Sequence, residues 1–122
     1  MKAAKEHQVP LSAAALKVLK SLKHDRDAED PVFPAQSGKK PLSNMAMLML
    51  LRRMKVDEFT VHGFRSTFRD WAGDKTDFAR EVVEHALAHT IGSEVERAYR
   101  RGHALEKRRE LMGAWGNFLA RE

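Results

Sequence analysis

The C-terminal segment from Ala104 to Ala120 constrains the fold of this chain most strongly, because its apolar residues recur at helical spacing. Its main stripe consists of Leu105, Met112, Trp115 and Leu119, with Leu111 and Phe118 beside it. An amphipathic helix buries such a stripe against other apolar surface. The segment therefore predicts a long helix that packs either on the chain's own core or on a neighbouring protein, and the sequence leaves both open.

Five shorter helices are predicted before this segment, so the chain is expected to be mainly α-helical. Ser12 is a good N-cap for the first helix, which extends through Lys23. Ser43 caps the second, which runs from Asn44 to about Met54. The second helix is apolar on nearly all sides, so we expect it in the core. An adaptable binding face is the alternative interpretation of its methionines.

The other three short helices carry or flank most of the polar residues discussed below. They are predicted over residues 62–73, 78–89 and 92–102, the first of them beginning at His62 or Gly63. Asp77 is positioned to cap the helix that begins at Phe78. Gly102 is of the residue type that commonly ends a helix. Two segments are predicted to be extended, over residues 6–11 and 31–34, the second within a proline-containing loop over 24–41.

The composition predicts a folded domain without disulfides. The 122 residues suit one compact domain or part of a larger one, with 43% hydrophobic and 32% charged residues. No apolar run is long enough for a transmembrane helix, and the N-terminal residues lead into no signal-peptide core. Cysteine is absent, which excludes thiolate metal sites. We therefore expect a cytoplasmic protein with no membrane partner.

The charge distribution favours a polyanionic partner. The formal net charge is +5 and the isoelectric point is about 9.7. The segment from Arg97 to Arg109 contains six basic residues and one acidic residue, Glu106. A solvated helix face is the alternative interpretation of this cluster. The cluster also flanks Tyr99, the only tyrosine in the chain.

Four side chains have the chemistry needed to transfer a phosphoryl group. His62 and Arg65 are three residues apart, so one helical turn presents both on the same face. The planar guanidinium of Arg65 suits two phosphate oxygens, and His62 and His89 suit donation or proton transfer near neutral pH. The phenol of Tyr99 has an ordinary pKa of about 10, so it needs nearby positive charge or a base to attack phosphorus.

The order of these residues resembles the tyrosine recombinases, in the form found in phage and prophage integrases. The segment from Thr60 to Ala72, TVHGFRSTFRDWA, is similar to their second signature box. The short motifs ALAH and AYRR, which end at His89 and Arg101, resemble the remaining signature and the nucleophile segment. The similarity continues into EKRRELM over residues 106–112. The first twelve residues, MKAAKEHQVPLS, resemble the family's β-hairpin and its lysine. The resemblance therefore covers essentially the whole chain.

The resemblance implies a role for each matching residue. Tyr99 would attack the scissile phosphate, forming a 3′-phosphotyrosyl link and releasing a 5′-hydroxyl. Arg65 would hold the phosphate oxygens, His62 would assist proton transfer at the nucleophile, and His89 would donate to the phosphate. Lys2 would protonate the leaving 5′-oxygen. The family reaction uses no nucleotide cofactor and no metal. Further phosphate contacts are expected from Arg97, Arg100 and Arg101.

The resemblance also implies the fold and the extent of the domain. Residues 1–122 would be the C-terminal part of an integrase catalytic domain, with a helical core and a remnant N-terminal β-hairpin strand in an α+β family fold. The upstream catalytic helices, a further catalytic arginine and the N-terminal DNA-binding domains have no counterpart in this sequence. The expected partners are double-stranded DNA and, at full length, other protomers in a synaptic tetramer.

Two functional hypotheses follow from this. In the first, the chain belongs to an enzyme that breaks and rejoins DNA, and by itself lacks activity. In the second, it is an inactive truncated remnant that acts at most as a basic DNA-binding module. A type IB topoisomerase shares the chemistry but fits the signature box and the C-terminal segment less well.

Some polar and aromatic residues receive structural interpretations. His85 and His89 are four residues apart and would share one helix face, as two metal ligands do, but the sequence offers no third ligand, so His85 is expected at the surface or in packing. Arg69 is interpreted as structural, with phosphate, Asp70 or Glu84 as its potential contacts. Trp71 and Trp115 are expected in the core.

Overall fold

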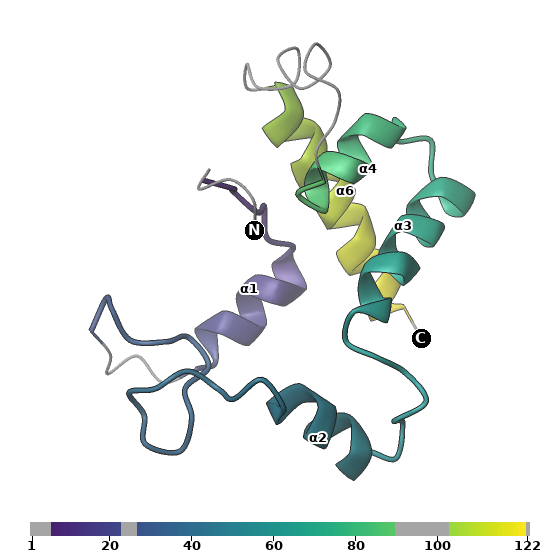
Figure 1. Ribbon diagram of the computed structural model, residues 1–122. Helices are drawn as coiled ribbons and strands as arrows, with labels where there is room; N and C mark the ends of the chain where they lie inside the picture. Colours follow the sequence, from purple (N-terminus) through teal and green to yellow (C-terminus); the bar gives the residue numbers. More distant parts are fainter. Residues whose placement is uncertain (1–5, 23–26, 90–102, 122) are drawn as a thin grey trace. The chain divides into compact units, whose positions relative to one another are not determined.

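The computed structural model describes residues 6–22, 27–89 and 103–121, and this part of the chain is mainly α-helical, as predicted (Figure 1). Its helices are α1 (Ala13–Lys20), α2 (Ala46–Arg53), α3 (Gly63–Lys75), α4 (Arg80–Ala86) and α6 (His103–Ala120). They belong to two compact units, which are considered separately. Unit 1 combines Met1–Ser21 with Thr67–Glu122, and unit 2 is Leu22–Ser66.

The core of unit 1 forms where α6 packs against α4 and the later turns of α3. Leu111 of α6 and Val82 of α4 have almost no exposed surface. The other buried members of this core are Phe68, Trp71, Ala72, Val83 and Leu87. Met112 and Trp115 of the predicted stripe pack on this cluster, as does Phe118 beside it, whereas Leu119 is 61% exposed. The C-terminal helix therefore packs on the chain's own core, the first of the two alternatives that the sequence left open.

Four aromatic rings occupy the centre of this core. The rings of Trp71 and Trp115 are 4.9 Å apart between centroids, and Trp115 stacks on Phe118 at 5.6 Å. Phe68 meets the edge of Trp115 at 5.4 Å. Such pairs add to the stabilisation from burial of the rings themselves. The structural interpretation of both tryptophans is confirmed.

The N-terminal part of unit 1 attaches to α6 through two contacts. Ser12 caps α1 as predicted, accepting from the backbone N–H of Ala15 at 3.2 Å. Gly116 of α6 lies so close that a Cβ at this position would be 2.6 Å from the Cβ of Ser12. Further along, the guanidinium of Arg108 donates to the backbone carbonyl of Gln8. Helix α1 ends at Lys20, three residues earlier than predicted.

Unit 2 contains α2 and a loop, and here the prediction of a buried second helix is wrong. Only Leu51 of α2 is buried, and the other residues that the prediction placed in the core are mostly exposed, among them Met45, Met47, Met49 and Leu50. The physical reason is that the described part of unit 2 offers few apolar neighbours. The first turn of α3 is the only other helical segment there. A short helix that is apolar on all sides is then covered on one side alone.

Other boundaries also differ from the sequence prediction. Ser43 does not cap α2 with its side chain, and the helix begins at Ala46 with Met45 as N-cap. Asp77 does not cap α4, whose N-cap is Ala79. Thr76 explains this difference, because its hydroxyl donates to the carbonyl of Ala72 and accepts from the N–H of Phe78. Its side chain thereby closes α3, which runs two residues past the predicted end at Gly73.

Helix α2 ends in a Schellman motif. Lys55 has a left-handed backbone with φ 60°. Its N–H donates to the carbonyl of Arg52 at 3.0 Å, and the N–H of Val56 donates to the carbonyl of Leu51 at 3.0 Å. These bonds satisfy carbonyls that the helix end would leave unpaired. They also place Val56 beside Leu51, the apolar pairing that commonly accompanies this motif.

Helix α4 ends in the same way, three residues before the predicted end at His89. Ala88 adopts φ 59° and its N–H donates to the carbonyl of His85 at 3.0 Å. The N–H of His89 donates to the carbonyl of Glu84 at 2.9 Å. The left-handed residue is usually glycine, and an alanine in its place hides the helix end in the sequence.

The predicted extended segments have different outcomes. An isolated antiparallel bridge joins Pro34 to Pro41, so the proline loop does contain a short extended contact. The predicted N-terminal β-hairpin is not seen in residues 6–12, and residues 1–5 lie outside the described part. The predicted fifth helix over 92–102 also lies outside it. No helix in the described parts combines the length and apolar character needed to cross a membrane.

Two glycines of α6 provide a test of how α1 and α6 pack. We expect Gly116→Ala to lower the free energy of unfolding by about 1–3 kcal/mol, because its Cβ would clash with Ser12. Gly113→Ala is the matched control. A Cβ at Gly113 meets nothing within 4 Å, so this change should raise stability by about 0.5–1 kcal/mol. Urea denaturation measures both, and a stabilising effect of Gly116→Ala would show that this contact does not exist.

The backbone of Ala88 gives a second stability prediction. We expect Ala88→Gly to stabilise the protein, because the left-handed strain that it removes, about 1–2 kcal/mol, exceeds the freedom it adds to the unfolded chain, about 0.4–1 kcal/mol. The same substitution at Ala86, within the last turn of α4, should destabilise by about 1 kcal/mol. Thermal unfolding of the two variants should therefore shift in opposite directions. Destabilisation by both would contradict the observed helix end.

Candidate functional site

His62 and Arg65 are placed by the turn that begins α3. Thr60 caps this turn, with its hydroxyl and its carbonyl accepting from the N–H of Gly63 at 3.0 and 3.1 Å. The N–H of Arg65 donates to the carbonyl of His62 at 3.1 Å, so the two residues bracket one turn. Both side chains are exposed. His62 directly precedes α3 and Arg65 lies in its first turn, so their presentation to one ligand stays a prediction.

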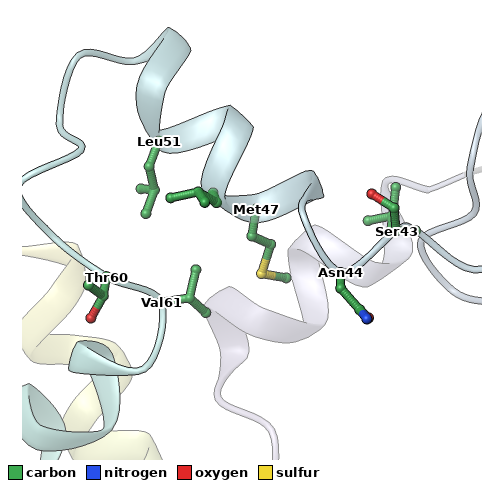
Figure 2. A pocket seen from close by; sticks show the side chains of 8 residues that line it. Ser43, Asn44, Met47, Leu51, Thr60 and Val61 are labelled. Atoms are coloured by element: carbon green, nitrogen blue, oxygen red, sulfur yellow. The ribbon is translucent and has the colours of Figure 1, made fainter.

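An apolar hollow supports the chain just before this turn. It has a volume of about 400 Å³ and is lined by Leu42, Ser43, Asn44, Met47, Leu48, Leu51, Thr60 and Val61. Figure 2 shows Met47 and Leu51 projecting from α2 on the side where Thr60 and Val61 lie. Residues of α2 and the two residues that precede His62 therefore line the same hollow.

His89 is placed by the Schellman motif that ends α4. Besides the backbone bond to Glu84, the imidazole Nδ1 of His89 donates to the Glu84 carboxylate. The residue is thus attached to Glu84 at two points. Its side chain is 40% exposed, whereas that of Glu84 is 16% exposed. The arrangement holds an imidazole at the end of α4 with its donor directions defined.

Glu84 also joins α4 to α3. The other oxygen of its carboxylate lies 3.7 Å from a guanidinium nitrogen of Arg69, the contact that the sequence interpretation named for this arginine. The hydrogen bond from His89 lowers the pKa of the Glu84 carboxyl below its ordinary value of 4.5, and the charges of Arg69 and Arg80 act in the same direction. Partial burial opposes these effects. Glu84 is therefore an anion at neutral pH, and it accepts from the imidazole.

The described residues include three of the five predicted catalytic side chains. His62 and Arg65 belong to unit 2, and His89 belongs to unit 1. Tyr99 and Lys2 lie outside the described part, as do the predicted DNA contacts Arg97, Arg100 and Arg101. Their roles stay predictions.

The interpretation of His85 and His89 as two metal ligands on one helix face does not fit the structure. Helix α4 ends at Ala86, so the two residues do not share a face, and Nδ1 of His89 contacts Glu84. The ring of His85 instead meets the edge of the His7 ring at 6.0 Å between centroids, which agrees with the packing role predicted for His85. Within residues 6–22, 27–89 and 103–121, no three His, Asp or Glu side chains gather as a metal site would require.

The basic cluster near the C-terminus is less uniform than the sequence suggests. Arg108 is only 5% exposed, and burial lowers the pKa of its guanidinium. Lys107 and Arg109 are exposed, and Arg109 lies 3.6 Å from Glu106. Arg108 therefore connects α6 to the N-terminal segment through the Gln8 carbonyl. Its buried guanidinium does not form part of a surface that could bind a polyanion.

Glu84 is the residue that the sequence analysis missed as part of a site. It is five residues before His89, a spacing that puts two side chains on different faces of a continuous helix. The Schellman motif changes this, because it folds the second residue after the C-cap back toward the last turn. The sequence does contain a glutamate five residues before a histidine. This spacing predicts a contact only when the helix is known to end at the left-handed Ala88.

The described groups suit the stabilisation of a phosphate in transfer. Arg65 offers a planar fork of donors, and the two histidines offer donors or proton carriers. A phosphoryl group in transfer needs mainly positioning and charge stabilisation, which such side chains supply.

Comparison with known proteins finds integrases among the relatives of the chain. The chain is 34% identical over 98% of its length to the prophage integrase IntA of Escherichia coli strain K12, and covers 29% of that protein. It is 30% identical to the integrase of Shigella phage Sf6, with 98% of the chain and 31% of the relative covered. The integrase of Enterobacteria phage P4 is 32% identical, with coverages of 98% and 28%. The chain thus spans less than a third of these relatives. No solved structure matches it significantly.

The model of the phage integrase family matches residues 1–106, which include all five predicted catalytic positions and the first four residues of α6. By this match, the chain belongs to the phage integrase family.

Proposed function

We propose that this chain is the C-terminal part of the catalytic domain of a site-specific DNA recombinase, which cuts and rejoins duplex DNA through a phosphotyrosine in the cytoplasm. The observation that carries the proposal is the match of the family over residues 1–106, combined with the capped turn that presents His62 and Arg65 together. The net charge of +5 supports DNA as the partner.

In this proposal each side chain has one task. Tyr99 attacks the scissile phosphate, which gives a 3′-phosphotyrosyl link and a free 5′-hydroxyl. Arg65 binds two non-bridging oxygens, His62 assists the proton transfer at the tyrosine, and His89 donates to the phosphate. Lys2 protonates the leaving 5′-oxygen. The energy of the broken bond is kept in the phosphotyrosine, so rejoining needs no nucleotide and no metal.

The remaining parts of the recombinase come from outside the 122 residues. The chain covers less than a third of the relatives' length, so we infer that upstream segments supply the further catalytic arginine and the domains that clamp the duplex. Arg97, Arg100 and Arg101 then contact phosphates beside Tyr99. Other protomers complete a synaptic tetramer on two duplexes.

The nucleophile is tested by trapping the covalent intermediate. The chain is joined to the upstream part of prophage integrase IntA and offered a nicked suicide substrate, from which the cut end escapes. We expect a protein–DNA adduct that survives denaturing electrophoresis. Tyr99→Phe should abolish it, and Arg65→Lys should slow it on the order of 10²–10³-fold through loss of the planar fork. An adduct formed by Tyr99→Phe would contradict the assignment of the nucleophile.

The alternative, an inactive DNA-binding module, is tested with the same proteins. The 122-residue chain alone should bind duplex DNA more weakly as salt rises, because phosphate contacts release counterions. If the joined protein binds DNA with this salt dependence yet forms no adduct under any condition, the DNA-binding module replaces the recombinase as the explanation. If neither protein binds DNA, both functions are wrong.

A further inference from the structure

We propose that Glu84 is a positioning residue for His89, fixing its imidazole through Nδ1 so that Nε2 is presented to the scissile phosphate. This inference rests on the proposed function for its final step, the contact with phosphate. Its first step, the control of the ring by Glu84, stands on the described structure alone.

The geometry attaches His89 to Glu84 twice. The backbone N–H of His89 donates to the Glu84 carbonyl at 2.9 Å, and its Nδ1 donates to the Glu84 carboxylate. The first bond fixes the backbone position of His89, and the second fixes the orientation of its imidazole ring. A ring held through Nδ1 meets any further group through Nε2. Glu84 thus determines which nitrogen of His89 is used for chemistry.

The carboxylate is itself held in place. One oxygen contacts His89, and the other lies 3.7 Å from Arg69 on α3. The side chain of Glu84 is 16% exposed, and it extends between α4 and α3 within unit 1. A carboxylate that is anchored by a second helix restricts the ring more than a solvated one does. Arg69 therefore supports the position of His89 indirectly.

The same helix end in α2 shows that a polar pair is not needed to build the motif. There the equivalent positions are Leu51 and Val56, whose side chains are apolar. In α4 a glutamate and a histidine take these positions. Both helix ends form the same backbone hydrogen bonds, so the glutamate and the histidine are not needed to end the helix. Their chemistry serves instead to orient the imidazole of His89.

The carboxylate of Glu84 is the acceptor in this pair. The hydrogen bond from His89 and the charges of His89, Arg69 and Arg80 all lower the pKa of the Glu84 carboxyl. The carboxylate is therefore an anion at neutral pH, and Nδ1 of His89 donates to it. A neutral ring that carries its proton on Nδ1 has a lone pair at Nε2, so donation from Nε2 to a phosphate requires the imidazolium.

The first experiment reads the ring directly in the 122-residue chain. Long-range nitrogen–proton NMR correlations identify which nitrogen of His89 carries the proton once the ring is neutral. We expect the Nδ1–H form in the unchanged protein and mainly the Nε2–H form in Glu84→Leu. Glu81→Gln, in the first turn of the same helix, is the control for loss of one charge. Identical forms of His89 in all three proteins would overturn the proposal.

A second experiment follows stability against pH. The folded-state pKa of Glu84 is lowered, so its contribution to stability is complete above pH 4.5 and is lost as the pH falls through the lower folded value. We expect the difference in the free energy of unfolding between the unchanged chain and Glu84→Gln to shrink as the pH falls below about 5. A difference that does not change with acid would mean that Glu84 is not bonded to His89 in solution, which overturns the proposal.

A third experiment tests the catalytic step in the joined protein. We expect Glu84→Leu to slow adduct formation by about 10–100-fold while the affinity for DNA is unchanged. An unchanged rate, or a loss explained by weaker binding alone, would overturn the role in catalysis. If the protein with Glu84 intact forms no adduct, the proposed function fails, whereas the NMR result still decides whether Glu84 controls the ring.

Discussion

The packing of α6 on α4 and on the later turns of α3 is the interaction on which unit 1 depends. Leu111 is fully buried, and Trp115 joins Trp71 and Phe68 in one aromatic cluster. Apolar burial on this scale, with about 25 cal/mol per Å² removed from water, outweighs any polar contact in the unit. Because α6 also holds Ser12 and Gln8, the same helix fixes the N-terminal segment.

The ends of the helices determine where the polar residues lie. The Thr60 cap starts α3 and sets the turn that carries His62 and Arg65. A left-handed residue, Ala88, ends α4 and brings His89 back toward its last turn. At both helix ends, the backbone conformation of a few residues determines where the polar residue lies. The helices themselves serve as rigid supports for these two ends.

The sequence predicted the helical character and most of the apolar pattern, because periodicity depends on burial that is local to each helix. It placed α6 within one residue and identified Ser12 as a cap. It failed where tertiary context decides, as with α2, whose apolar residues are covered on one side only. It failed also at Ala88, where the chain adopts a conformation that alanine disfavours. The start of α3 at His62 or Gly63 was predicted, although its Thr60 cap was not. The partnership of Glu84 and His89 was also missed, because a five-residue spacing indicates a contact only when the position of the helix end is known.

The energies at the end of α4 argue that its polar pair does not exist for stability. The contact between Arg69 and Glu84 has one half-exposed partner and contributes about 0–1 kcal/mol. The hydrogen bond from His89 contributes about 1.5–3 kcal/mol at most, and the left-handed alanine costs about 1–2 kcal/mol. An apolar pair such as Leu51 and Val56 closes α2 with the same backbone bonds and desolvates no charge. A glutamate and a histidine are therefore not needed to close the end of α4. Their distinctive effect is to hold an imidazole in one orientation, which is a requirement of chemistry and not of folding.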